Sequence, residues 1–260
     1  MLRYEYKYYV SNQKLDLLRA LVEPNVKLDK FAASCPEKHY TVRSIYFETP
    51  DFECYHTKMA GIKNRIKVRL RGYNEEDISK IVFMEIKRKF ESPIFKDRAP
   101  LTYGGALEVI GGKPLDNYIM DKHNFEVSRD SARKFLYNVH GRNMKPVVNV
   151  IYEREPWLNR FDDSENNLRI TFDKNLRSNS YPTLEELYME KESKYTLEGF
   201  FILEIKFNIR FPVWMNPIIK ILNLKRQSAS KYCLCVDSHY PKINIDNRFD
   251  TLSRGRIFSD

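Results

Sequence analysis

Cysteine is rare in this chain of 260 residues, which contains only Cys35, Cys54, Cys233 and Cys235. These four form no C-x-x-C pair and have no histidine cluster beside them, so the pattern favours reduced, buried thiols over disulfides or a zinc site. The longest apolar stretch, 211–224, is interrupted by proline, asparagine and lysine and cannot span a bilayer. The N-terminus is charged and aromatic, without the apolar core of a signal peptide. The sequence therefore predicts a cytoplasmic protein with no integral membrane segment.

Glycine is also scarce, with nine residues, and no phosphate-binding G-x-x-x-x-G-K-[ST] loop occurs. The five histidines lack metal-ligand spacing. A formal net charge of +9 favours anionic partners, namely phosphates, nucleic acid or a membrane surface. Because the sequence has no RNP-type or helix-turn-helix pattern, we expect no nucleic-acid partner.

Charged and apolar residues alternate with a period of two in many segments, which is typical of β-strands. The strands predicted from this alternation span residues 3–10, 40–47, 62–71, 80–89, 146–154, 168–174 and 200–207. Apolar residues spaced as on one helix face predict helices after Ser11, near 128–140 and near 213–222. The charged stretch 175–199 is expected to be exposed.

The most informative segment is 62–71, because its charged face carries only positive side chains. The cations on this face are Lys63, Arg65, Lys67, Arg69 and Arg71. An antiparallel sheet with one face in water explains charge alternation on a single strand. A solvated face usually mixes both signs of charge, however, and arginine suits bidentate contact with phosphate. The segment therefore favours a phosphate-binding face.

Isolated carboxylates accompany the cations in E-x-K pairs, whose two side chains project from the same side of a strand. The three pairs are Glu5 with Lys7, Glu85 with Lys87, and Glu204 with Lys206. If these strands close into a barrel with the charged faces inward, the cations repel one another until a polyanion neutralises them. Carboxylates in such an interior suit Mg²⁺ or Mn²⁺, which bind carboxylate and phosphate oxygens. The pattern predicts a site for a triphosphate or longer phosphate chain, with Glu5, Glu85 and Glu204 as metal ligands.

Seven motifs occur in an order that resembles a known family. They are RYEYKYYV, KVRLRGY, FMEIKRK, VIYER, LRITFD, FILEIKF and a late SKY. Together they resemble the VTC domain, the polyphosphate polymerase domain of the CYTH or triphosphate tunnel superfamily, over residues 1–240. The resemblance implies an α+β fold in which an antiparallel β-barrel forms a tunnel and the helices pack outside. It leaves residues 241–260 as a C-terminal tail.

The resemblance also assigns roles residue by residue. The catalytic cations that it implies are Arg69, Arg71, Lys87, Arg154 and Arg169. The substrate-binding residues that it implies are Lys7, Lys206, Ser230 and Lys231, to which the charged strand faces add Lys67 and Lys89. Glu204 matches the metal-binding glutamate of the family. The sequence departs from the resemblance at Arg3, where the superfamily has a glutamate, and at Ser228, where a lysine is frequent.

The resemblance implies an enzyme that builds polyphosphate by metal-dependent transfer of the γ-phosphate of ATP. Its partners are then ATP and polyphosphate or pyrophosphate, and its cofactor is Mn²⁺ or Mg²⁺. Two other functions are compatible with the same residues. One is an inorganic triphosphatase or tripolyphosphatase of the same fold, and the other is a non-catalytic sensor of polyphosphate or nucleotide. The sequence leaves open whether a membrane-anchored partner protein holds the chain.

Overall fold

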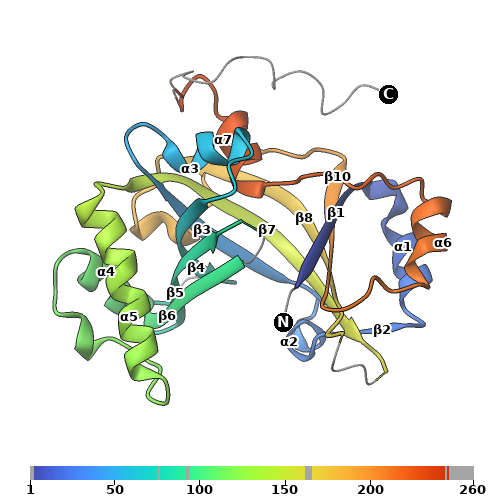
Figure 1. Cartoon of the computed structure of the whole chain (residues 1–260), viewed down its shortest axis with the longest axis horizontal. Coiled ribbons are helices and arrows are strands. Elements are labelled where there is room, and N and C mark those ends of the chain that lie inside the picture. The colour runs from blue at the N-terminus through green and yellow to red at the C-terminus, as the bar shows by residue number, and fades with distance from the viewer. Residues whose placement is uncertain (1–2, 75–76, 92–93, 162–165, 244, 246–260) are drawn as a thin grey trace.

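One antiparallel sheet of ten strands organises the computed structural model, which describes residues 3–74, 77–91, 94–161, 166–243 and 245 (Figure 1). The strands are β1 (Tyr4–Ser11), β2 (Val26–Leu28), β3 (Tyr40–Glu48), β4 (Arg65–Tyr73), β5 (Ile81–Lys89), β6 (Ile94–Thr102), β7 (Lys145–Asn159), β8 (Arg169–Ser180), β9 (Lys194–Tyr195) and β10 (Phe200–Phe207). The α-helices are α1 (Leu15–Val22), α2 (Lys30–Ser34), α3 (Glu53–Met59), α4 (Tyr103–Ile110), α5 (Phe125–Leu136), α6 (Met215–Ile221) and α7 (Lys231–Ser238). Short helical turns are η1 (Asn12–Lys14), η2 (Leu115–Asn117), η3 (Tyr137–Gly141) and η4 (Glu185–Tyr188).

The sheet curls without closing by strand pairing. Its hydrogen-bonded order is β1-β10-β8-β7-β3-β4-β5-β6, and no pairing joins β1 to β6 within the described residues. Side chains bridge the curl, because Lys87 Nζ on β5 lies 3.8 Å from Glu5 Oε2 on β1. The antiparallel sheet with its helices agrees with the predicted α+β class, whereas the predicted closed barrel is not confirmed.

Alternation along the strands gives the sheet an apolar outer face and an inner face that carries the charged residues. Two apolar clusters cover the outer face. In one, α5 places Phe135 against strand residues such as Met84. In the other, Leu18 of α1 and Ile218 of α6 pack against Phe172 of β8. Figure 1 shows α4 and α5 at one end of the sheet and α1 and α6 at the other. Burying these side chains stabilises the fold by about 1.5–3 kcal/mol each and holds the charged face inward.

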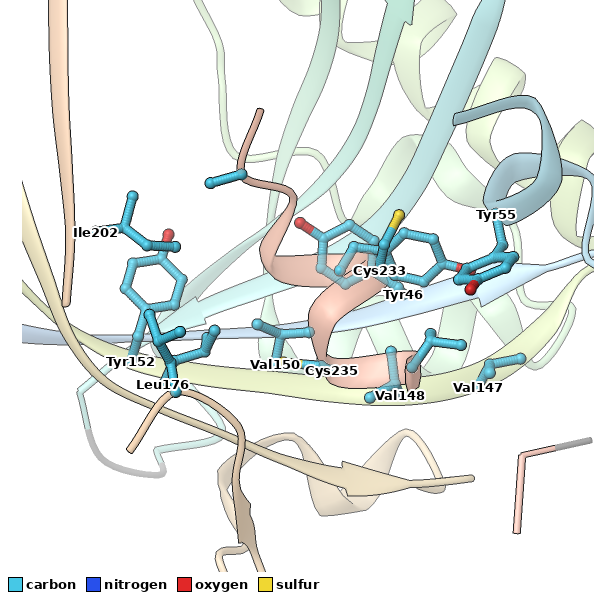
Figure 2. Packing of buried hydrophobic residues seen from close by; sticks show 14 of the residues in the cluster. Tyr46, Tyr55, Val147, Val148, Val150, Tyr152, Leu176, Ile202, Cys233 and Cys235 are labelled. Carbon is cyan, nitrogen blue, oxygen red and sulfur yellow. The ribbon is translucent and has the colours of Figure 1, made fainter. Parts of the chain in front are cut away.

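Helix α7 packs on the inner face. Its Cys233 and Cys235 lie in an apolar cluster with Tyr46 and Val150 (Figure 2). Ser230 caps the helix, because its hydroxyl accepts a hydrogen bond from the Cys233 N–H. The prediction that the helices pack outside is therefore wrong for α7, which fills part of the interior and leaves the rest to charged side chains.

Two stretches differ from the pattern-based prediction. Strand β4 begins at Arg65 rather than at residue 62. The stretch 175–199 was expected to be exposed, but it continues β8 and buries Leu187 and Leu197. Apolar residues spaced irregularly among charges anchor this stretch, and such spacing has no simple period.

The predicted C-terminal tail, 241–260, contains two core residues. Ile243 and Ile245 are buried in the same cluster as α7. Residues 244 and 246–260 of the predicted tail lie outside the described residues, so the domain boundary at residue 240 stays a prediction. In the part of the chain that the structure describes, no helix is both long and apolar enough to cross a membrane.

A buried carboxyl, Glu48, joins the end of β3 to α7. It accepts a hydrogen bond from the Cys54 N–H at 3.1 Å and another from the Tyr232 hydroxyl. Burial raises the pKa of Glu48 to about 7. An unfolded glutamate has a pKa of about 4.3, so the folded chain holds a proton on Glu48 that the unfolded chain loses between these two values.

We expect Glu48→Gln to remove one component of the pH dependence of stability. The folded form binds more protons at this site than the unfolded form. Glu48 therefore makes its full contribution to the free energy of unfolding below about pH 4.3, and this contribution is lost as the pH rises to about 7. Relative to Glu48→Gln, the wild-type free energy of unfolding should fall by about 2–4 kcal/mol across this window. Urea unfolding at several pH values measures it. The exposed Glu198→Gln variant is the control, and parallel curves for wild type and Glu48→Gln would contradict the assignment.

Candidate functional site

A cavity of about 640 Å³ lies on the inner face beside α7. Its cations, among the described residues, are Lys7, Lys58, Arg65, Lys67, Arg69, Arg71, Lys87, Lys89, Arg154, Lys206, Arg226 and Lys231. Against these twelve cations, two carboxylates of the described residues line it, Glu5 and Glu204. The cavity therefore concentrates positive charge in a partly desolvated interior, which favours a polyanionic ligand.

Most of the predicted site residues meet in this cavity. Those that line it are Arg69, Arg71, Lys87, Arg154, Lys7, Lys67, Lys89, Lys206, Ser230, Lys231, Glu5 and Glu204. The ten on strands meet because every second side chain of a strand faces inward and antiparallel pairing aligns the inward faces. Ser230 and Lys231 reach the cavity from the start of α7. Sequence reasoning missed Lys58 and Arg226, since a single cation in a helix or loop belongs to no strand pattern. Of the fourteen predicted residues, Arg169 and Glu85 do not line the cavity.

Arg169 lies on the inner face of β8, next to the cavity. It is paired in register with Lys206 of β10. Its Nη2 donates a hydrogen bond to the Tyr40 hydroxyl at 3.4 Å, and its buried Nε has no hydrogen-bond partner within the described residues. The predicted catalytic role of Arg169 therefore remains a prediction.

Glu5 and Glu204 form a carboxylate pair held by two lysines. Lys7 Nζ lies 2.7 Å from Glu5 Oε1 and 3.4 Å from Glu204 Oε2. Lys206 pairs with Glu204 and lies 3.9 Å from Glu5 Oε2. Burial acts to raise the pKa of both carboxyls, but the lysine charges outweigh it and leave each pKa below its usual value. Both groups are therefore ionised at neutral pH.

Glu85 on β5 is enclosed by cations of β4 and β6. Its Oε2 accepts hydrogen bonds from Arg69 Nε at 2.8 Å and from Arg69 Nη2 at 2.6 Å. Its Oε1 lies 2.7 Å from Lys96 Nζ and 3.2 Å from Arg98 Nε, and Arg71 Nη1 lies 3.9 Å from Oε2. Burial acts to raise the pKa of Glu85, but these cations hold it far below its usual range. Glu85 thus orients Arg69 and Arg71, the two arginines of β4 that line the cavity.

The three glutamates predicted as metal ligands are therefore not brought together. Within the described residues, no group of three or more histidine, cysteine, aspartate or glutamate side chains could hold a metal. The pair of Glu5 and Glu204 is enough for a hard divalent cation, because Mg²⁺ is commonly held by one or two carboxylates together with phosphate oxygens. Their ionised oxygens are the donor type that Mg²⁺ and Mn²⁺ prefer.

Asp173 on β8 ties a strand cation to the first residue of α7. Its two oxygens accept hydrogen bonds from Arg154 Nε at 2.7 Å and Nη2 at 2.8 Å, and Lys231 Nζ lies 2.5 Å from Oδ2. Burial acts to raise the pKa of Asp173, yet Arg154 and Lys231 lower it to about 2. Sequence reasoning missed this residue, because one aspartate within a strand carries no motif.

Two tyrosines support the cations of the cavity. The Arg69 guanidinium lies 5.6 Å from the ring centroid of Tyr46, and Arg69 Nη1 donates to the Tyr46 hydroxyl at 2.8 Å. Lys231 Nζ and the Arg154 guanidinium lie 4.9 and 5.2 Å from the ring centroid of Tyr152. Burial acts to raise the pKa of Tyr46, but neighbouring cations led by Arg69 lower it to about 8. Such cation–π contacts contribute about 0.5–2 kcal/mol each and fix the directions of the cations.

Comparisons with known proteins give one family and several similar structures, two of which are described here. A family model described as the VTC domain matches residues 2–240. No curated protein matches the chain. A candidate adenylate cyclase of Bacillus halodurans is 14% identical, with a TM-score of 0.45 over 88% of this chain and 94% of its own. A candidate adenylyl cyclase of Hippeastrum, described as having a dominant triphosphatase activity, is 13% identical, with a TM-score of 0.47 over 91% of this chain and 96% of its own. Likenesses this distant carry no argument about function.

Glu85→Gln tests whether Glu85 orients arginines or binds metal. The variant leaves Arg69 and its neighbouring cations without their carboxylate, so we expect the free energy of unfolding to fall by about 3–5 kcal/mol. Affinity for tripolyphosphate without metal should fall about tenfold, because Arg69 and Arg71 lose their orientation. The factor by which Mn²⁺ strengthens tripolyphosphate binding should equal that of the wild type. Calorimetric titration with and without Mn²⁺ measures both quantities.

Glu85→Asp is the matched control for this variant, because it keeps the charge and should recover part of the affinity and stability. A Mn²⁺ enhancement that disappears in Glu85→Gln while metal-free binding stays intact would make Glu85 a metal ligand and reject the orienting role.

Proposed function

Since the chain belongs to the VTC domain family, we propose that it transfers the γ-phosphate of ATP to polyphosphate or pyrophosphate in its cation-lined cavity. The reaction uses Mg²⁺ or Mn²⁺. The interior of the curled sheet acts as the tunnel, and the Lys87–Glu5 ion pair crosses this interior between β5 and β1.

The observation that carries the proposal is the charge of the cavity. Its lining cations outnumber its lining carboxylates by ten among the described residues, twelve against two. Cations held this closely repel one another at low dielectric, so a strongly anionic ligand is needed to neutralise them. A phosphate chain carries its negative charges along a line, and the strand cations are likewise arranged in rows.

The chemistry requires little from the protein besides position and charge. The attacking group is the terminal phosphate of the acceptor, which is already ionised at neutral pH, so no general base is needed. Arg69, Arg71, Lys87 and Arg154 hold the phosphates in line and stabilise the charge that develops on the transferred group. Glu85 and Asp173 keep these arginines fixed before substrate binds.

Glu5 and Glu204 are the residues that would hold the divalent cation. Bound there, the metal supplies neutralisation of phosphate charge. Lys7 and Lys206 pair with these carboxylates and lie where they could also bind phosphate oxygens. The same two lysines would therefore link the metal-holding carboxylates to the substrate.

One assay separates this function from the two others that the residues permit. Purified protein is incubated with ATP and Mn²⁺, and long phosphate chains are sought on a gel. In parallel, orthophosphate release from tripolyphosphate is measured. Long chains support the polymerase, orthophosphate without chains identifies a triphosphatase, and neither product together with tight tripolyphosphate binding identifies a sensor.

We expect Arg71→Ala to lose activity while remaining folded. Arg71 lines the cavity, and its Nε donates to the Ser44 hydroxyl at 3.1 Å. Removing one cation that stabilises transition-state charge should cost about 2–4 kcal/mol of barrier, or roughly 10²–10³ in rate. Chain synthesis from ATP measures the rate, and circular dichroism reports folding. The exposed Arg133→Ala variant on α5 removes the same charge far from the cavity, and normal turnover by Arg71→Ala would count against the assignment.

Glu204→Gln should weaken the dependence on metal. The substitution keeps the shape of the side chain and removes the charge that a divalent cation needs, so the Mn²⁺ concentration for half-maximal activity should rise at least about tenfold. A matched variant, Glu198→Gln, removes an exposed carboxylate on a loop. An unchanged metal titration in Glu204→Gln would reject its role as a ligand.

A further inference from the structure

Thr171 on β8 has a buried hydroxyl group without a partner. Its side chain is 1% exposed, and its Oγ1 makes no hydrogen bond within the described residues. Other buried polar atoms of these residues also lack a partner, but each belongs to a side chain that makes some other hydrogen bond, ion pair or ring contact. A buried hydroxyl without a partner destabilises the fold, so the hydroxyl of Thr171 calls for an explanation.

Thr171 lies on the inner face of β8, next to the carboxylate pair. Its chain neighbours Ile170 and Phe172 belong to an outer apolar cluster, so alternation turns Thr171 inward. It is paired in register with Glu204 of β10, which places the two Cβ atoms about 4.5–5.5 Å apart. Its register partner on the other side, Pro156 of β7, offers no polar side chain. Glu204 is therefore the polar side chain directly opposite Thr171.

Two carboxylates are near enough in the sheet to accept a hydrogen bond from Thr171. One is Asp173, two residues further along β8, whose oxygens already accept from Arg154 and lie 2.5 Å from the Lys231 ammonium. The other is Glu204, which within the described residues is contacted only by the two lysines of the carboxylate pair. A carboxylate has about four acceptor positions, so Glu204 can accept a further hydrogen bond.

We propose that Thr171 is a positioning residue of the divalent-cation site, whose hydroxyl donates a hydrogen bond to the Glu204 carboxylate when that carboxylate holds the metal. This inference rests on the proposed function for the presence of the metal and adds the residue that orients one of its ligands. Ligating carboxylates are usually hydrogen-bonded to a neighbouring group, which fixes their direction. A hydroxyl suits this position because it donates without adding a positive charge, whereas another lysine or arginine would repel the metal.

The test replaces the Thr171 hydroxyl with a methyl group of similar size. Mn²⁺ is titrated into wild type, Thr171→Val, Thr171→Ser and Thr183→Val, and the electron paramagnetic resonance signal of free Mn²⁺ measures binding. Thr183→Val is the matched control, because it makes the same change at an exposed position. Calorimetric titration with tripolyphosphate without metal and thermal unfolding without metal are measured on the same four proteins.

We expect Thr171→Val to bind Mn²⁺ at least about tenfold more weakly than wild type, the usual effect of losing a group that orients a metal ligand. Thr171→Ser keeps the hydroxyl and should recover most of the Mn²⁺ affinity, and Thr183→Val should match wild type. Affinity for tripolyphosphate without metal should be unchanged in all variants. The midpoint of thermal unfolding of Thr171→Val should equal or exceed that of wild type, because the substitution removes an unpaired buried hydroxyl.

Unchanged Mn²⁺ affinity in Thr171→Val, or a loss that Thr171→Ser does not recover, would overturn the inference and leave the proposed function intact. A lower unfolding midpoint in Thr171→Val would overturn it as well, because the hydroxyl would then be a structural donor. Failure of wild type to bind Mn²⁺ would contradict the metal site and the inference with it. Failure of wild type to bind tripolyphosphate would instead contradict the proposed function.

Discussion

Repulsion among inward-facing cations is the constraint on which the rest of this structure depends. Four carboxylates offset it from inside the sheet: Glu85, Asp173, and the pair of Glu5 and Glu204. Buried ion pairs seldom add net stability, because desolvating the charges costs about as much as their attraction returns. The folding free energy therefore has to come from the apolar clusters, and the carboxylates serve to fix where the cations point.

The apolar clusters are placed where they can hold the charged face in position. Two lie outside the sheet, under the helix pairs, and hold every strand in a register that turns its cations inward. The third lies inside, where α7 covers one part of the inner face. Because Lys231 at the start of α7 pairs with Asp173 on β8, the position of the helix and the electrostatics of the cavity depend on each other.

Much of this arrangement follows from local pattern, and the remainder depends on contacts between distant segments. Period-two alternation predicted strands in seven segments, all of which are strands of the sheet, and ten of the twelve predicted site residues that line the cavity lie on them. The other two, Ser230 and Lys231, were assigned by the resemblance. The alternation missed β6, because the run Ile94–Thr102 mixes charged and apolar residues without a regular face. It also missed Lys58, Arg226 and Asp173, whose positions depend on a helix, a loop and a cross-strand partner. Strand alternation could not reveal that α7 lies inside the curl.

The three E-x-K pairs show why sequence spacing does not settle a role. Each pair projects from one side of its strand, and on that ground all three glutamates were equivalent. The neighbouring strands give the three glutamates different partners. Glu5 and Glu204 are paired in register with lysines of the partner strand, so they lie side by side and can share a cation. Glu85 is paired with Arg69 on one side and Arg98 on the other, so guanidinium groups surround it where the other two glutamates have lysines and a second carboxylate. The chemistry of each carboxylate is therefore decided by cross-strand register, which depends on the outer apolar clusters far from the cavity.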